Sequence, residues 1–118
     1  MSLKGKKLLV DVPIIATSHH CGRKRVLINN DDTPSAITQI AVTALAAGER
    51  VSTHLHPTME EYFLIRKGRL RIHIQDDSDD FGPDSFIRIP ANAQHSMEAL
   101  SDCELLTIGC ACEGCMGA

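Results

Sequence analysis

Residues 53–68 read THLHPTMEEYFLIRKG and combine two histidines, two adjacent glutamates, an apolar run and a glycine. On a strand, alternate side chains point to the same face, so His54 and His56 are expected to project together while Leu55 points away. After the turn at Pro57 the chain re-enters an extended stretch, and the carboxylate of Glu61 can return to the same interior. Two imidazoles and a carboxylate suit a divalent transition metal.

The chain around this stretch consists of short apolar runs separated by turn residues, without a sustained helical period. The segment RLRIHIQ at 69–75 alternates strictly, which predicts a strand with Leu70, Ile72 and Ile74 on one face and His73 on the exposed face. About eight such strands favour a barrel or a sandwich. The predicted strands span 25–29, 37–46, 50–56, 61–66, 69–75, 85–90, 95–99 and 103–109.

Three further segments complete this outline. The stretch from Leu8 to Ile15 is expected to form an early strand, and the polar run at 29–35 a loop. The acidic run DDSDDFGPD at 76–84 holds turn formers and few apolar residues, which predicts a solvated hairpin connection.

Composition limits the partners and the location. The net charge is −3, Lys and Arg are scattered and Trp is absent, which argues against nucleic acid and against an anionic membrane as partners. Asp11 and Pro13 interrupt the N-terminal apolar stretch, which is too short to span a bilayer. Four of the five cysteines lie between Cys103 and Cys115, which favours reduced thiols and hence a cytoplasmic protein.

A third histidine joins the candidate metal ligands. His95 follows the strand-like SFIRIP and the tight turn PANAQ, so adjacent hairpins are able to converge on one point. The candidate set is then His54, His56, Glu61 and His95.

The spacing resembles that of the cupin family. The first cupin motif runs Gly, five residues, His-x-His, three or four residues, Glu, six residues, Gly, and the chain matches it throughout from Gly48 to Gly68. The second motif runs Gly, five residues, Pro-x-Gly, two residues, His, three residues, Asn. Here Asp84 and Asn92 replace the glycines and Ala99 replaces the asparagine. Asn92 is expected to keep the left-handed turn, whereas a bend at Gly82–Pro83 is expected to substitute for Asp84.

The resemblance implies a single-domain cupin jelly-roll β-barrel over residues 1–118, with its motif core at about 35–109 and a Cys-rich tail at 110–118. It also implies that His54, His56, Glu61 and His95 hold one divalent ion, which is Mn, Fe, Ni, Co or Zn. The six residues before Gly68 select Glu61 rather than Glu60, although the family also allows the shorter spacing that would select Glu60.

The implied function is a metal-dependent enzyme acting on a small oxygenated molecule such as a sugar or an oxo-acid, by isomerase, lyase or dioxygenase chemistry. The alternative is a non-catalytic small-molecule-binding or sensor cupin, because the family holds both and the fold does not decide. Strand parity makes Phe63 and Met97 either the pocket wall or ordinary core residues, and turns Tyr62 away from the site.

Two further expectations concern the ends of the chain. Cys110, Cys112 and Cys115 form a second candidate site, either for a thiophilic ion or as a redox-active Cys112–Cys115 disulfide, unless the tail is simply reduced. Family resemblance also implies a homodimer, with the segment from Leu8 to Ile15 contributing to the interface.

Overall fold

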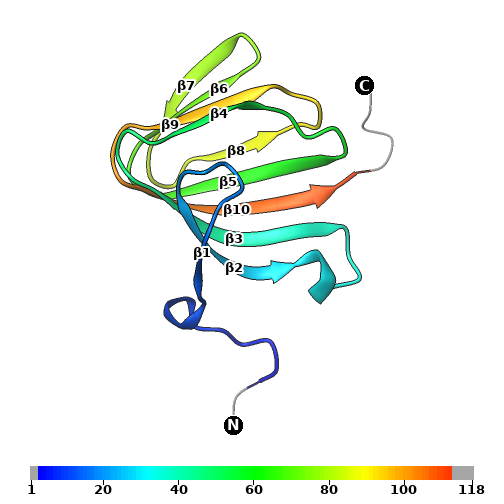
Figure 1. Ribbon diagram of the computed structural model, residues 1–118. Coiled ribbons are helices and arrows are strands. Elements are labelled where there is room, and N and C mark those ends of the chain that lie inside the picture. The colour runs from blue at the N-terminus through cyan, green and yellow to red at the C-terminus, as the bar shows by residue number, and fades with distance from the viewer. Residues whose placement is uncertain (1–2, 113–118) are drawn as a thin grey trace.

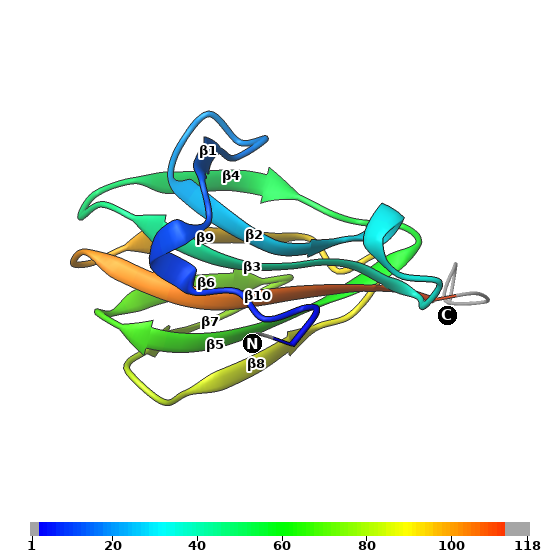
Figure 2. The ribbon, with the colours of Figure 1, turned by 90° about the horizontal axis from the view of Figure 1, so that it is seen from below.

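A computed structural model, which describes residues 3–112, consists of two antiparallel sheets that face each other (Figures 1 and 2). The larger sheet has the strand order β1-β2-β3-β10-β5-β8 and the smaller has the order β4-β9-β6-β7. The all-β prediction is confirmed, while closure of the sheets into a barrel stays a prediction. The elements are η1 (Leu9–Asp11), β1 (Ile14–Ala16), β2 (Arg23–Asn29), η2 (Asn30–Asp32), β3 (Ile37–Leu45), β4 (Arg50–His54), β5 (Met59–Lys67), β6 (Leu70–Ile74), β7 (Asp77–Phe81), β8 (Phe86–Ile89), β9 (His95–Ala99) and β10 (Cys103–Ala111).

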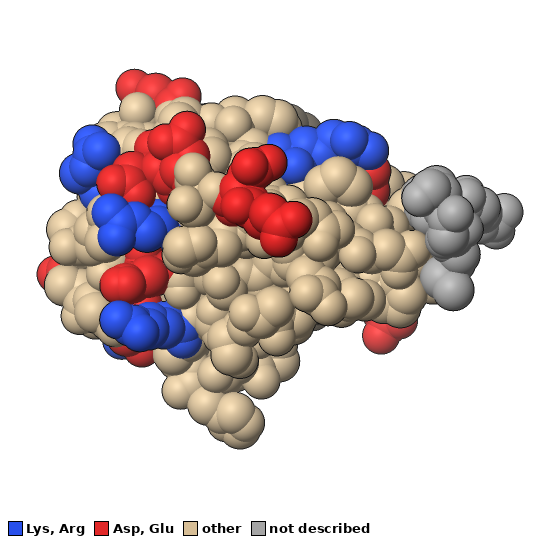
Figure 3. All heavy atoms as spheres, turned by 90° about the horizontal axis from the view of Figure 1, so that it is seen from above, with Lys and Arg blue, Asp and Glu red and all other residues tan. Residues whose placement is uncertain are grey.

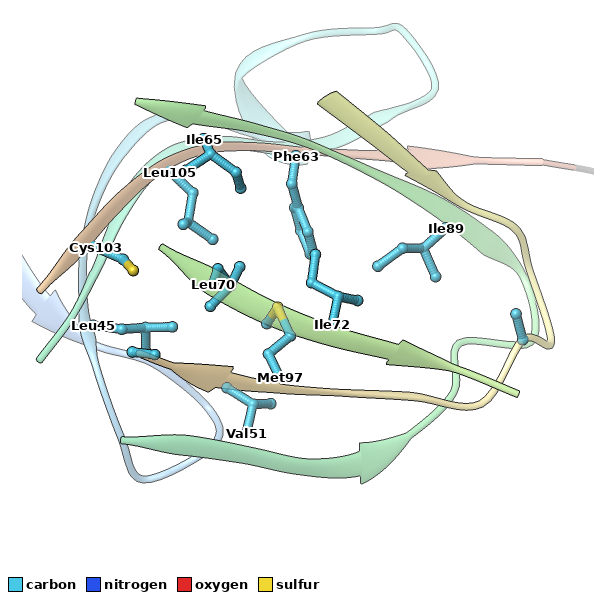
Figure 4. Packing of buried hydrophobic residues seen from close by; sticks show 12 residues of the cluster. Leu45, Val51, Phe63, Ile65, Leu70, Ile72, Ile89, Met97, Cys103 and Leu105 are labelled. Carbon is cyan, nitrogen blue, oxygen red and sulfur yellow. The ribbon is translucent and has the colours of Figure 1, made fainter. Parts of the chain in front are cut away.

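The hydrophobic core fills the space between the sheets (Figure 4). Leu70 and Ile72 of β6 are buried, whereas Arg71 between them and His73 after them are exposed, as the alternation of this segment predicts. Facing them from the larger sheet are Phe63 and Ile65 of β5, which are also buried. Alternate positions of β5 and β6 therefore supply the core, as the pleat requires. The other buried members of the cluster are Leu45, Val51, Ile89, Ala93, Met97, Ala99, Cys103 and Leu105.

The acidic run is a strand, so the prediction of a hairpin connection over 76–84 is wrong. Asp77–Phe81 forms β7, which pairs with β6 from Ile74 opposite Asp77 and leaves only a two-residue turn between the strands. β7 is an edge strand of the smaller sheet and its side chains are mostly exposed, so its sequence lacks the apolar alternation that would have predicted a strand. Its backbone ladder with β6 and the ion pair from Arg71 Nε to Asp80 Oδ1 at 2.8 Å hold it in place.

The N-terminal segment also differs from its prediction. Leu8 to Ile15 was expected to be one strand, but Leu9–Asp11 forms a short 3-10 helix and only Ile14–Ala16 pairs with β2. Pro13 lies between them and has no N–H to give to a sheet ladder, so the strand starts after it. The predicted loop at 29–35 contains the 3-10 helix η2.

The surface carries both signs of charge. On the face shown in Figure 3, basic and acidic side chains are interspersed rather than separated into a single patch. No helix within residues 3–112 has the length and apolar character needed to cross a membrane.

Candidate metal centre

Both sheets contribute side chains to one cluster. His54 is the last residue of β4 and lies opposite His95, the first residue of β9, while Glu61 comes from β5 of the facing sheet. His56 follows β4 in the loop that leads to β5. Each residue offers one ligand atom, and these four atoms all lie within 4.8 Å of one another. The four side chains expected from the sequence therefore meet at one point.

An irregularity in β4 aims His54 inward. The register of β4 against β9 shifts between Val51 and His54, and the two residues between them, Ser52 and Thr53, are both exposed. Val51 is 4% exposed and His54 is partly buried, so both side chains point between the sheets although they are three residues apart. Strict alternation would have separated them, and the bulge brings them to the same face.

Backbone carbonyls orient two of the imidazoles. His54 Nδ1 lies 2.8 Å from the Ser52 carbonyl oxygen, and His95 Nδ1 lies 2.9 Å from that of Ala93. A carbonyl only accepts hydrogen bonds, so each Nδ1 carries the proton and each Nε2 is left for the cluster. This arrangement fixes the ring orientation in the way that metal-ligating histidines require.

Glu61 is the anionic member of the cluster. Its Oε1 lies 3.1 Å from His56 Nε2 and 3.2 Å from His95 Nε2, which donates to it only when His95 is protonated, because the neutral ring has its proton on Nδ1. Burial opposes ionisation of Glu61, but the bond from His95 and the charge of the nearby imidazoles hold its pKa below the ordinary value. Burial alone would lower the pKa of His95, and the bond to Glu61 raises it instead. Burial lowers the pKa of His54.

The donor set fits a divalent ion. His56 Nε2 is buried, and its contact with Glu61 lacks hydrogen-bond geometry, so this atom has no hydrogen-bond partner within residues 3–112. A buried polar nitrogen without a partner is unfavourable by about 1–3 kcal/mol unless something else satisfies it. An ion shared with the three other groups would supply that partner. The His₃Glu group is thus able to bind a metal ion.

The neighbouring glutamate points to the other side of β5. Glu60 pairs with Arg88 of β8, whose Nε lies 3.2 Å from Oε1, and the Tyr62 hydroxyl donates to the same oxygen at 2.6 Å. The hydrogen bonds from Arg88 and Tyr62 hold the pKa of Glu60 below its ordinary value. Glu60 and Tyr62 therefore form a separate surface cluster, on the face opposite Glu61.

A cavity of about 200 Å³ adjoins the cluster. Phe63 and Met97 line it and also belong to the hydrophobic core, and their role as the wall of a ligand pocket stays a prediction. His19, in the loop between β1 and β2, also lines the cavity, with its ring centroid 4.4 Å from that of His54. Burial lowers the pKa of His19. Sequence reasoning missed this residue because a loop histidine has no strand parity or motif spacing to mark it.

The second candidate site, at the C-terminus, is only partly covered. Cys110, near the end of β10, is a free thiol. Cys21 and Cys103 are free thiols as well. Cys115 lies outside the described residues. The thiol site formed by Cys110, Cys112 and Cys115 therefore stays a prediction.

Comparison with known proteins gives one curated relative and many solved structures. The curated relative is the protein named polyketide synthase CurC from Streptomyces cyaneus, 28% identical over 63 residues, which are 53% of this chain and 41% of the relative. The match thus spans about two fifths of that protein's length.

Several of the solved structures are described as oxalate decarboxylases, and two of them serve as examples. One, described as a predicted oxalate decarboxylase from Thermotoga maritima, has a TM-score of 0.80 at 16% identity and covers 88% of this chain and 96% of its own. The other, oxalate decarboxylase from Bacillus subtilis, is described as having Mn(II) centres. It has a TM-score of 0.72 at 21% identity and covers 87% of this chain and 28% of its own. At these identities the likeness shows the fold.

The family is shown by a sequence model. The model described as "Cupin domain" matches residues 41–109, which include all four residues of the His₃Glu group. The match covers more than half of the chain, and the fold of the solved structures agrees with it. The chain belongs to the cupin family.

Proposed function

We propose that this cupin is a metal-dependent enzyme that acts on a small oxygenated molecule, with His54, His56, Glu61 and His95 as the ligands of one divalent transition metal ion. The observation that carries the proposal is the convergence of their four ligand atoms within 4.8 Å. Three neutral imidazoles and one carboxylate leave a divalent ion with about one net positive charge. An ion that prefers six ligands keeps two positions for oxygen donors.

The bound ion would supply Lewis-acid or redox chemistry to an oxygen-bearing substrate. The residues of the chain have other roles. The carbonyls of Ser52 and Ala93 hold the rings of His54 and His95, and Phe63 and Met97 give the cavity an apolar wall that limits water. A cavity of about 200 Å³ favours a small molecule as the substrate.

The reaction belongs to the isomerase, lyase or dioxygenase type. The Mn(II) centres named for the Bacillus subtilis oxalate decarboxylase support manganese as the first ion to test, and Fe, Ni, Co and Zn follow.

The alternative function is a non-catalytic binding or sensor cupin. Restored metal should give turnover in an enzyme, whereas a sensor should show only ligand-induced stabilisation.

Elemental analysis of protein purified without added metal tests the site. We expect about one ion per chain in the native protein and in the His73→Gln control, because His73 is exposed on β6. The His54→Gln variant should lose the ion, since a ligand is removed. Equal metal content in both variants, or none in the native protein, would contradict the assignment.

We also propose a homodimer formed through the N-terminal segment. Leu8, Val10, Ile14 and Ile15 are 45–74% exposed in the single chain, and β1 is an edge strand of the larger sheet. Exposed apolar side chains beside an open sheet edge favour pairing with a second copy. Sedimentation of the native protein and of Ile14→Lys should give a dimer and a monomer, respectively, and a monomeric native protein would refute this. A cytoplasmic location stays a prediction.

A further inference from the structure

Part of the wall of the cavity that adjoins the His₃Glu group is polar and carries a lysine. Lys24 of β2 lies opposite Thr43 of β3 in the sheet register, so the two side chains share a face. Both line the cavity, together with Gln39 of β3 and Thr107 of β10. Among the described residues that line this cavity, Lys24 is the only lysine or arginine.

Lys24 has no anionic partner within residues 3–112. No carboxylate of this part of the chain lies within ion-pair distance of its ammonium group. Its Nζ donates instead to the neutral Oε1 of Gln39 at 2.9 Å. The Gln39 amide nitrogen donates to Asn29 Oδ1 at 3.0 Å, so this contact turns the amide oxygen toward the lysine. An ammonium has three donors, and two of them are left for a ligand.

The hydroxyl groups beside Lys24 extend this polar wall. Thr107 Oγ1 donates to the Ala41 carbonyl oxygen at 3.1 Å, and Thr43 Oγ1 lies 3.2 Å from Thr107 Oγ1. Because the Thr107 proton is used by Ala41, Thr43 donates to Thr107. Both hydroxyl protons are thus used within the protein, so among Lys24, Thr43 and Thr107 only the lysine has donors left for an anionic ligand.

The charges of the cavity add up to a preference for anions. With a divalent ion, the three neutral imidazoles and one carboxylate leave about one positive charge, and Lys24 adds another. Both lie on a cavity of about 200 Å³, where partial burial strengthens their attraction for an anion relative to bulk water. A neutral sugar or diol would leave the lysine unpaired, whereas an acid with a second carboxylate would pair with it.

We propose that the cavity takes a small acid with two anionic ends, which binds the metal through a chelating pair of oxygens and pairs its distal carboxylate with Lys24. This inference rests on the proposed metal site and narrows its substrate class to acids of the 2-oxo or 2-hydroxy dicarboxylate type. Lys24 and Gln39 are then specificity-determining residues, and they take no part in the chemical step.

Two matched probes separate the distal carboxylate from the chelating end. 2-Oxoglutarate and 2-oxopentanoate have the same chain length and the same 2-oxo acid, and differ in whether the far end is a carboxylate or a methyl group. Their affinities for the Mn²⁺-loaded protein are measured by calorimetry, for the native protein, for Lys24→Met and for the control Lys67→Met, whose lysine is exposed and contacts Glu104 on β10.

We expect Lys24→Met to weaken 2-oxoglutarate binding about 10- to 100-fold, as for loss of a hydrogen bond to a charged group, and to change 2-oxopentanoate binding by less than about twofold. Lys67→Met should leave both unchanged. Metal content should be native in both variants, so that failure of the metal site is recognised separately. The inference is overturned if the metal-loaded protein binds 2-oxoglutarate no more tightly than 2-oxopentanoate, binds neither acid, or loses affinity for both probes equally in Lys24→Met.

Discussion

The two ligand-bearing segments of this cupin differ in sequence but agree in backbone conformation. The segment from Gly48 to Gly68 keeps every residue of the first family motif, whereas the segment from Asp84 to Ala99 departs from the second motif at three positions. Yet Gly48 and Gly68 have φ of 87° and 80°, and Asp84 and Asn92 have φ of 69° and 66°. All four residues lie in the left-handed region, so each of these turns depends on that conformation. Glycine itself is needed only at a turn where a side chain would have no room.

The structure corrects one expectation about these turns and confirms another. Asn92 adopts the left-handed conformation expected of it, and its N–H donates to the His56 carbonyl oxygen at 2.9 Å. Asp84 was expected to be bypassed by a bend at Gly82–Pro83, but Asp84 itself takes the left-handed conformation. Its N–H donates to the Ile65 carbonyl oxygen at 2.8 Å, which ties the turn to β5.

The largest effect is expected where a glycine is sterically required. In Gly68→Ala, the new Cβ would lie 2.1 Å from the Asp102 carbonyl oxygen, in a residue that also has positive φ. Left-handed strain and overpacking together predict a loss of about 2–5 kcal/mol in the free energy of unfolding, measured in urea. In Gly48→Ala the Cβ would have no atom within 4 Å, so the loss should be only about 1–2 kcal/mol. Equal losses in the two variants would show that the space around Gly68 is unimportant.

A smaller loss of stability is expected for Ala99→Asn, which restores the asparagine of the second motif. This side chain is 1% exposed in the apolar cluster, and its backbone bonds to Gly48 and Glu49, joining the two segments. Ala99→Asn places an amide among apolar side chains and should destabilise the protein by about 1–3 kcal/mol. Unfolding by heat, compared with Ala99→Ser as a smaller polar change, checks this. Increased stability of the asparagine variant would contradict this prediction and would mean that the site offers hydrogen-bond partners to the amide.

The smallest change is expected at Asp84, which is exposed. Asp84→Gly should be at least as stable as the native protein, because glycine adopts φ of 69° without strain. Asp84→Ala should be less stable than Asp84→Gly by about 1 kcal/mol, because alanine does not favour this region. Urea unfolding of the pair measures the difference, and an alanine variant as stable as the glycine one would contradict the role given to the turn.

The sequence predicted the parts of the fold in which side-chain pattern and burial agree. Leu70 and Ile72 alternate with His73 in β6 and are buried as the pattern indicates, and β9 has the predicted bounds from His95 to Ala99. β7 was missed because it lies at a sheet edge and buries little, so its sequence has no apolar alternation. The burial of a side chain follows from its own apolar character, which the sequence displays. The backbone hydrogen bonds of an exposed edge strand depend instead on the strand beside it, which the local sequence does not display.

The site was predictable to a similar extent. Motif spacing named the four residues that meet, but the bulge between Val51 and His54 is invisible to a strict period of two. His19 reaches the cavity through the path of a loop, and Lys24 matters through the sheet register that places it beside Thr43. Such contacts between distant segments have no local signal in the sequence.

The comparison of Glu60 with Glu61 tests the metal site most directly. These neighbours differ only in the face of β5 that they occupy: Glu61 contacts His56 and His95, whereas Glu60 contacts Arg88. Calorimetric titration of metal-free protein with Mn²⁺ should show one ion bound per chain in native protein and in Glu60→Gln. In Glu61→Gln the affinity should fall by about 100-fold or more, since even loss of an outer partner of a ligand weakens binding about 10- to 100-fold. Retained affinity in Glu61→Gln with loss in Glu60→Gln, or no binding by the native protein, would contradict the account.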